Sequence, residues 1–198
     1  MKKLLFMAAV AVFGLTSVNA QEEASTSGFA QGDVFATGTI AFVSESTGDV
    51  KDNGFTFSPK AGYFVSENIA VGVALGYTTT KSEVPNVEDY KTNMFEAGVF
   101  GRYYFTPASQ FSFFGELGVN FESSKEEQGN AEAKANGFNV GLAPGISYFV
   151  SNCLALEASF GVLGYRTNEP DVDNAESTDT FAVGLNLSDI NFGITYKF

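Results

Sequence analysis

Eight segments of the sequence, each about ten residues long, alternate strictly between bulky apolar residues and small or polar ones. In the clearest segment, residues 69–78, one face carries Ile, Val, Val, Leu and Tyr, and the other carries Ala, Gly, Ala, Gly and Thr. Successive side chains of a β-strand point to opposite faces, so strict alternation predicts strands whose two faces meet different surroundings. Helical periodicity is almost absent after residue 20. The sequence therefore predicts an all-β protein.

The connections between these segments alternate in length. Residues 66–68, 106–110 and 151–152 form short connections, whereas residues 44–53, 81–91, 124–135 and 167–179 form long, polar ones. An even number of strands with short turns at one rim and long loops at the other is typical of outer-membrane barrels. We therefore predict an eight-stranded antiparallel up-and-down transmembrane β-barrel, with its first and weakest strand near residues 34–43 and its last at the C-terminus.

A soluble, lipocalin-like barrel is the alternative, because it too is exported, alternating and eight-stranded. Such a barrel would place the bulky face inside. Here the opposite face is rich in Gly, Ala, Ser and Thr, which suits the narrow interior of eight strands, whereas a soluble exterior should carry many more Lys and Glu residues. The bulky face is therefore predicted to contact lipid.

Aromatic residues gather at the segment ends, as expected where an apolar band meets the two membrane interfaces. The predicted girdle at the short-turn rim contains Tyr63, Tyr103, Phe105, Phe111, Phe113, Tyr148, Tyr196 and Phe198, and the girdle at the long-loop rim contains Phe55, Tyr77, Phe95, Phe121 and Phe138. Phenylalanine takes the place of the usual tryptophan, which the chain lacks.

Residues 1–20 have the pattern of a secretory signal peptide. Lys2 and Lys3 precede an apolar run of about twelve residues, and Val18 and Ala20 put small residues at the −3 and −1 positions of a cleavage site. A membrane anchor would need about 20 apolar residues, which this run does not reach. We expect cleavage after Ala20 and one domain, the barrel, over residues 21–198.

The composition weakens several classes of function. The 198-residue chain carries 23 acidic and 11 basic residues, a formal net charge of −12, no histidine and one cysteine, Cys153. The chain therefore has no Ser-His or Cys-His pair and no imidazole metal ligand, and the acidic excess disfavours nucleic-acid binding. We expect no catalysis, cofactor, metal site or nucleic-acid partner. We interpret Cys153 as a small apolar filler rather than a reactive thiol.

The inward face carries charges of both signs. Lys60, Arg102 and Lys197 are balanced there by Glu96, Glu116 and Glu157. A packed polar network of mutually satisfied pairs is the favoured interpretation, because an unpaired charge in a narrow interior costs several kcal/mol and eight strands leave room for side chains rather than for a wide channel. The alternative is an ion path or gate.

The long polar connections hold fourteen acidic residues against five lysines, Lys51, Lys81, Lys91, Lys125 and Lys134. A solvated surface is the favoured interpretation. Residues 171–174, Asp-Val-Asp-Asn, weakly suggest a calcium loop, but the glycine and distal glutamate of an EF-hand are missing.

The last eight residues, Asn-Phe-Gly-Ile-Thr-Tyr-Lys-Phe, resemble the C-terminal signal by which outer-membrane barrels are recognised for assembly, with Gly193, Tyr196 and the terminal Phe198 as its matching positions. The whole mature chain resembles the small porin-family barrels, the group with OmpA-like, OmpX-like and OmpW-like members. This resemblance implies the outer membrane of a Gram-negative bacterium as the location. It also implies lipid, lipopolysaccharide and the barrel-assembly machinery as partners. The barrel enzymes of similar architecture place an essential histidine at the rim, and this chain has none.

We accordingly expect a monomeric, non-enzymatic barrel that strengthens the envelope or presents its loops for surface binding. The alternative is a narrow channel for ions or small solutes.

Overall fold

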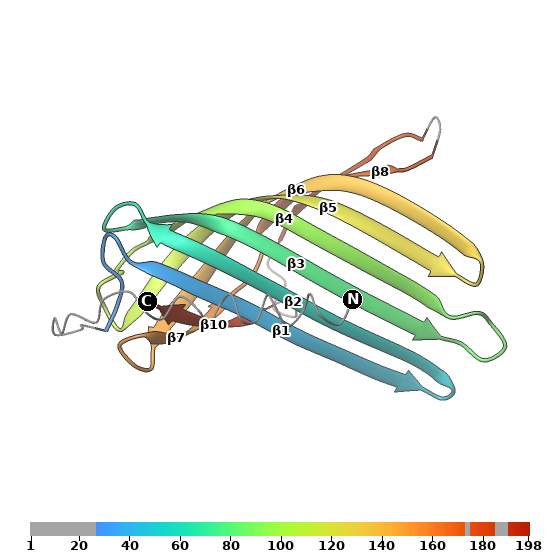
Figure 1. Ribbon diagram of the computed structural model, residues 1–198, viewed down its shortest axis with the longest axis horizontal. Coiled ribbons are helices and arrows are strands. Elements are labelled where there is room, and N and C mark those ends of the chain that lie inside the picture. The colour runs from blue at the N-terminus through green and yellow to red at the C-terminus, as the bar shows by residue number, and fades with distance from the viewer. Residues whose placement is uncertain (1–26, 173–174, 185–189) are drawn as a thin grey trace.

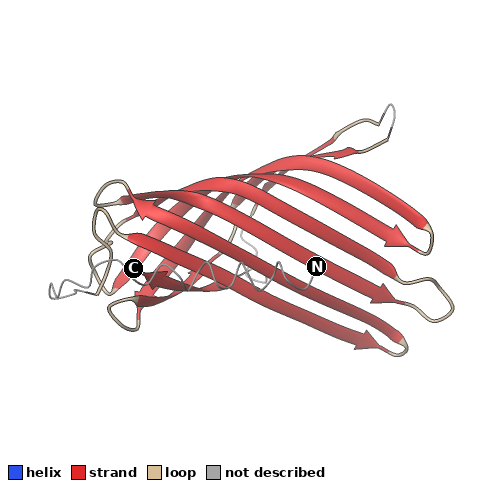
Figure 2. Ribbon diagram, in the orientation of Figure 1, coloured by secondary structure: helices blue, strands red, loops and turns tan. Residues whose placement is uncertain are grey.

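The computed structural model describes residues 27–172, 175–184 and 190–198. Every regular element in these ranges is a β-strand (Figure 2). None of the ranges contains a helix with the length and apolar character needed to span a bilayer. The predicted signal peptide, residues 1–20, lies outside the described residues.

The strands are β1 (Val34–Thr47), β2 (Val50–Phe64), β3 (Ile69–Glu83), β4 (Tyr90–Tyr104), β5 (Phe111–Gln128), β6 (Ala131–Phe149), β7 (Leu154–Ser159), β8 (Leu163–Pro170), β9 (Thr178–Val183) and β10 (Asn191–Lys197). All pairings between them are antiparallel, in the order β5-β4-β3-β2-β1-β10-β7-β6-β8-β9, and the pairing of β5 with β6 closes the sheet. β7 and β8 both pair with β6 and are two parts of one barrel strand. β9 pairs with β8 and β10 with β7, so these two strands together take the next position in the barrel. The predicted closed eight-stranded barrel is thus confirmed (Figure 1).

The break between β7 and β8 has a local cause. The N–H of Phe160 donates to the carbonyl oxygen of Pro144 on β6 at 3.2 Å, but proline has no N–H with which to return the bond. One bond of the ladder is therefore missing at this point. Beyond it the N–H of Val162 donates to the oxygen of Leu142 at 3.0 Å. The ladder then continues with its register shifted by one residue, because Gly145 pairs with Ser159 but Leu142 pairs with Leu163.

The long polar connections are largely strand rather than loop. β1 and β2 continue to a tight turn at Gly48, and β5 and β6 continue to a tight turn at Gly129, with φ angles of 63° and 56° that favour glycine. Alternation is lost in these extensions because both of their faces meet water, while the backbone ladder continues regardless of side-chain character. The prediction of long loops at residues 44–53 and 124–135 was therefore wrong, because only short turns at residues 48–49 and 129–130 connect these strands.

The two faces of the wall differ as predicted. Bulky outward side chains are exposed, as at Phe42 (76%) and Val73 (58%), whereas inward Phe35 and Phe64 are fully buried. At the short-turn rim, outward aromatic rings pack edge to face within the pairs Tyr103–Phe105, Phe111–Phe113 and Tyr196–Phe198.

Candidate functional site: the barrel interior

Aromatic side chains fill the interior at the short-turn end. The buried apolar residues of the described chain, which we call the aromatic plug, are Phe29, Phe35, Phe64, Ala70, Phe100, Tyr104, Phe114, Phe149 and Ala155. The ring centroid of Phe29 lies 4.7 Å from that of Phe64, 4.8 Å from Phe149 and 5.3 Å from Tyr104. Phe29 is therefore the centre of the plug, although it precedes the first strand.

Glycines on neighbouring strands make room for these rings. A Cβ atom on Gly62 would lie 2.3 Å from the Cζ atom of Phe35, and one on Gly145 would lie 2.4 Å from the Cζ atom of Phe114. Real Cβ atoms do not approach that closely. Alternation of very small and very large inward residues thus closes the narrow interior by direct packing.

The segment before β1 is bonded to the short-turn rim. The N–H of Phe29 donates to the oxygen of Pro107 at 2.7 Å, and the ammonium of Lys197 on β10 donates to the oxygen of Gly28 at 2.6 Å. Gly28 has a φ of 128°, and a Cβ there would lie 2.5 Å from the carbonyl carbon of Ala108. Only glycine fits this turn, which inserts Phe29 into the barrel mouth.

A layer of ion pairs lies next to the aromatic plug. Arg102 on β4 donates from Nη1 to both oxygens of Glu157, at 2.9 and 3.0 Å, and from Nε to Glu116. Lys60 on β2 also donates to Glu116, and the Tyr104 hydroxyl accepts from Arg102 Nη1 at 2.9 Å. We call Lys60, Arg102, Glu116 and Glu157 the ion-paired layer. Arg102, Glu116 and Glu157 are each at least nine-tenths buried, so this layer lies across the interior rather than along a wide lumen.

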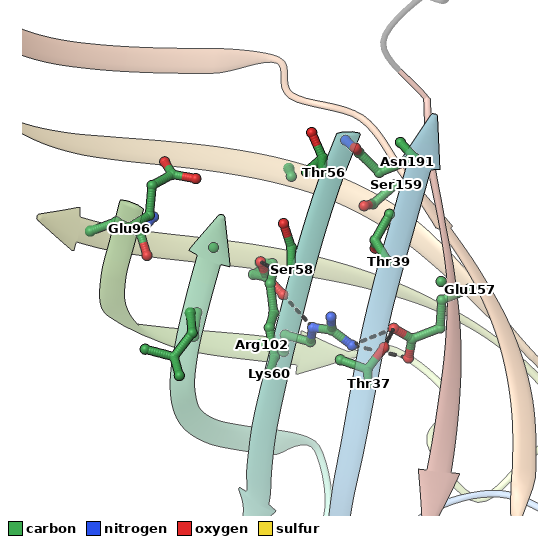
Figure 3. Close-up of a pocket in the computed structure, with 18 residues that line it drawn as sticks. Thr37, Thr39, Thr56, Ser58, Lys60, Glu96, Arg102, Glu157, Ser159 and Asn191 are labelled. Atoms are coloured by element: carbon green, nitrogen blue, oxygen red, sulfur yellow. Dashed lines mark hydrogen bonds and ion pairs between the residues drawn. The ribbon is translucent and has the colours of Figure 1, made fainter. Parts of the chain in front are cut away.

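The other two residues of the predicted charge network lie elsewhere. Lys197 is at the short-turn rim, 3.8 Å from Asp33, and Glu96 lies further toward the long hairpins, where it accepts from Asn139 at 3.2 Å. Figure 3 shows Glu96 separated from the Arg102–Glu157 pair. The six charges therefore do not form one network.

Sequence reasoning missed a second interior group around Glu96. Glu122 is 7% exposed, lies directly opposite Glu96 in the β4–β5 register, and pairs with Arg166 of β8 at 2.9 Å. Glu122 could have been found, because it continues the alternation that places Glu116 inward. Arg166 was harder to assign, because the break after β7 interrupts the alternation.

A cavity of about 330 Å³ lies between these two charged groups. Its lining includes hydroxyl groups of Thr37, Thr39, Thr56, Ser58 and Ser159 together with the charged groups of the ion-paired layer (Figure 3). Among the described residues, no group of three or more carboxylate or thiol ligands is placed to hold a metal ion. Of the weak calcium-loop pattern, Asp173 and Asn174 lie outside the described residues.

The C-terminal strand closes the barrel. β10 pairs with β1 through four residue pairs, Phe35–Lys197 to Gly38–Ile194, and with β7 through six. The N–H of Phe198 donates to the oxygen of Val34 at 3.0 Å. Of the predicted assembly signal, Gly193 lies opposite the inward Glu157, while the rings of Tyr196 and Phe198 pack edge to face on the outward side, their centroids 5.0 Å apart.

One solved structure of a known protein agrees with this architecture, and two further barrels are similar to the chain at lower scores. The solved structure of OprG from Pseudomonas aeruginosa has a TM-score of 0.56 and 14% identity over 87% of this chain and 98% of that one. Neisserial surface protein A has a TM-score of 0.49 and 20% identity, covering 83% of this chain and 97% of that one. The barrel domain of Pseudomonas aeruginosa OprF has a TM-score of 0.49 and 12% identity, covering 86% and 100%.

A search of curated protein sequences found no match. The family model for the outer membrane protein beta-barrel domain matches residues 8–198, nearly the whole chain. The chain therefore belongs to the outer membrane protein beta-barrel domain family and is a protein of the outer membrane.

Proposed function

We propose that this barrel is a non-enzymatic envelope protein that strengthens the outer membrane and presents its extended hairpins at the surface, without conducting ions. The observation that carries the proposal is the closure of the interior by two successive layers. The aromatic plug excludes water at the short-turn end, and the ion-paired layer beside it uses Arg102 to satisfy two buried carboxylates at once. An ion crossing the barrel would have to displace both layers.

A narrow channel is the second candidate, and the polar cavity of about 330 Å³ favours it. Hydroxyl groups and charged side chains line this cavity, and such a lining can solvate a small solute. The cavity would become part of a path only if the aromatic plug and the ion-paired layer both moved. The two candidates therefore differ in one measurable property, which is conductance of the folded native protein.

Planar-bilayer recording of the full mature protein tests the proposal. Heat-dependent gel mobility and flotation with vesicles establish beforehand that the protein is folded and inserted. We expect no discrete current steps at any applied voltage. A triple variant, Phe29→Ala and Phe64→Ala with Arg102→Ala, opens both the aromatic plug and the ion-paired layer and, after the same two checks, should conduct more than the native protein. Discrete steps from the native protein would establish the channel instead.

A further inference from the structure

Glu96 points into the barrel near the level of the outer membrane interface. Its neighbour Phe95 belongs to the predicted aromatic girdle of the long-loop rim and is exposed on the outward face, so the side chain of Glu96 lies on the inward face. The carboxylate lines the interior cavity of about 330 Å³. An inward carboxylate at membrane depth is costly unless a cation or hydrogen-bond donors compensate it, and it marks a candidate functional site.

The charges around the cavity do not balance. The ion-paired layer at its inner end contains two positive and two negative side chains. At its outer end Arg166 pairs with Glu122 at 2.9 Å, and Glu96 has no ion pair within 4 Å in the described ranges. Glu96 and Glu122 face each other directly in the β4–β5 register, and like charges in this position repel. A positively charged ligand beside Glu96 would supply the missing charge and relieve this repulsion.

Two oxygen atoms on this side of the cavity have no hydrogen-bond donor in the described part of the chain. The Nδ2 atom of Asn139 donates to Oε1 of Glu96 at 3.2 Å, whereas Oε2 of Glu96 lies over Gly76, 2.7 Å from where a Cβ atom would stand. Asn120 donates from Nδ2 to Asn139 at 3.0 Å, and its Oδ1 atom lies over Gly98. The two glycines therefore leave room for a carboxylate oxygen and an amide oxygen that can accept from a ligand.

Water reaches the cavity although one end of the barrel is closed. Lys60 points inward as part of the ion-paired layer, yet its side chain is 28% exposed, whereas that of Arg102 beside it is 4% exposed. The aromatic plug lies beyond this layer and closes the short-turn end. The cavity therefore opens toward the long hairpins, which face the exterior in outer-membrane barrels. A ligand can enter it without crossing the barrel.

The wall that faces Glu96 across the cavity carries hydroxyl groups. They belong to Thr39 of β1, Thr56 and Ser58 of β2 and Ser159 of β7, and Figure 3 shows them on the side of the cavity away from Glu96. A hydroxyl group both donates and accepts hydrogen bonds, so it suits the hydroxyl groups of a ligand. The cavity volume of about 330 Å³ lies at the lower end of the range for small-molecule sites and can hold a molecule of the size of a hexose.

An ammonium group suits this site better than a metal ion. Calcium takes many oxygen ligands, commonly from several carboxylates, and among the described residues no group of three or more carboxylate or thiol ligands could hold a metal ion. An ammonium group needs hydrogen-bond acceptors, which the carboxylate of Glu96 and the amide oxygen of Asn120 supply. The ammonium group of Lys60 at the inner end would repel a second amine. The cavity therefore fits a molecule with one amine and several hydroxyl groups.

From this arrangement we propose that the interior cavity binds a small polyhydroxylated amine of the amino-sugar class, with its ammonium group at Glu96 and its hydroxyl groups at the threonine and serine side chains opposite. The ligand enters and leaves by the hairpin end. This inference goes beyond the proposed function, because it assigns a ligand to the closed interior. A conducting native protein would overturn the proposed function and leave the binding site unaffected.

Ligand-observed NMR titration of the refolded mature protein in a neutral detergent tests the inference. The probes are glucosamine, at a pH where its amine is charged, and glucose, which has a hydroxyl group in place of the amine. The native protein should bind glucosamine about tenfold more tightly than glucose. Glu96→Gln keeps the shape of the side chain and removes its charge, so it should weaken glucosamine binding about tenfold and leave glucose binding unchanged.

Three further variants separate the cavity from the surface, and heat-dependent gel mobility establishes that each is folded. Glu88→Gln removes one negative charge from the exposed rim and should leave glucosamine binding unchanged. Glu122→Gln releases Arg166 from its ion pair and lets it neutralise Glu96, so glucosamine binding should weaken. Ser58→Leu fills part of the cavity and should weaken the binding of both sugars.

Four results would overturn the inference. The first is a native protein that binds glucosamine no more tightly than glucose, or binds neither sugar. The second is undiminished glucosamine binding by the folded Glu96→Gln variant. The third is an equal loss in Glu88→Gln and Glu96→Gln, which would indicate attraction to the acidic rim as a whole. The fourth is undiminished binding of both sugars by the folded Ser58→Leu variant, which would place the sugars outside the cavity.

Discussion

The two ends of this barrel use the same strands in opposite ways. At the short-turn end, inward side chains such as Phe64 and Tyr104 are completely buried, and the segment before β1 packs among them. At the other end, β5 and β6 continue to Gln128 and Ala131 with exposed or half-buried side chains on both faces. Side-chain packing fixes the first end, whereas backbone hydrogen bonds and weak surface ion pairs hold the second. Substitutions should therefore be costly at the first end and tolerated at the second.

The largest effect is expected from Arg102→Ala, at the boundary between the two ends. The change leaves the buried carboxylates of Glu116 and Glu157 without their shared partner, which should cost about 3–5 kcal/mol of unfolding free energy. Urea unfolding in lipid vesicles measures the loss. Arg166→Ala is the matched control, because Arg166 is half exposed and Glu122 keeps its bond from Asn139, so the cost should be clearly smaller. Equal losses of unfolding free energy in the two variants would show that the ion-paired layer stabilises the barrel no more than the Arg166–Glu122 pair does.

Phe29→Ala should come second. It removes the central ring of the aromatic plug and leaves a cavity among Phe35, Phe64, Tyr104 and Phe149, at a cost of about 3 kcal/mol. The same urea titration reports the change, and Phe29→Leu, which keeps most of the volume, should lose less than about 1.5 kcal/mol. If the alanine variant were as stable as the native protein, the Phe29 ring would not contribute to stability, and the packing of the plug would depend on the strand residues alone.

Two glycine substitutions compare the cost of adding a methyl group on the inward face of the wall with its cost on the outward face. Gly62→Ala forces a methyl group against the Phe35 ring and should cost about 1–3 kcal/mol. In Gly101→Ala the new methyl group meets nothing within 4 Å on the outward face, so stability should change little. The urea midpoints of unfolding of the two variants test this difference, and the midpoint of Gly62→Ala should be the lower one. Similar midpoints would contradict close packing of the plug.

The smallest effect concerns the tip of the β5–β6 hairpin. Hydrogen bonds from Lys125 and Lys134 hold the pKa of Glu132 below its usual range. The carboxylate therefore favours the paired hairpin at neutral pH, and this contribution disappears as the pH falls through that lowered pKa. Amide exchange at Gln128–Ala131, compared between the native protein and Glu132→Gln at each pH, should differ at neutral pH and converge in acid. A difference that persisted in acid would exclude this ion pair as the cause.

The alternation in the sequence was sufficient to predict the barrel, its strand number and its outward face. Residues 69–78 keep period two without drift, and the structure makes them a continuous part of β3. The same parity placed Lys60, Arg102, Glu116 and Glu157 inward. It could not show that Glu96 and Lys197 stand at other heights, because height depends on the stagger between strands, which one strand's sequence does not contain.

The extended hairpins were harder to predict for a different reason. In residues 44–53 and 124–135 neither face is buried, so no hydrophobic pattern marks the strands that β1, β2, β5 and β6 nevertheless continue there. Phe29 was also missed as a plug residue, since a single aromatic in a short polar segment carries no periodicity.

The sequence by itself determined the closed all-β wall, its lipid-facing side and the residues available to fill the interior, because alternation is a local property that each strand carries alone. Only the tertiary structure decided which of those residues meet. The pairing of Arg102 with two glutamates from other strands and the insertion of Phe29 both depend on register and barrel closure. These features fix relative positions between strands, and the pattern within any one strand does not encode them.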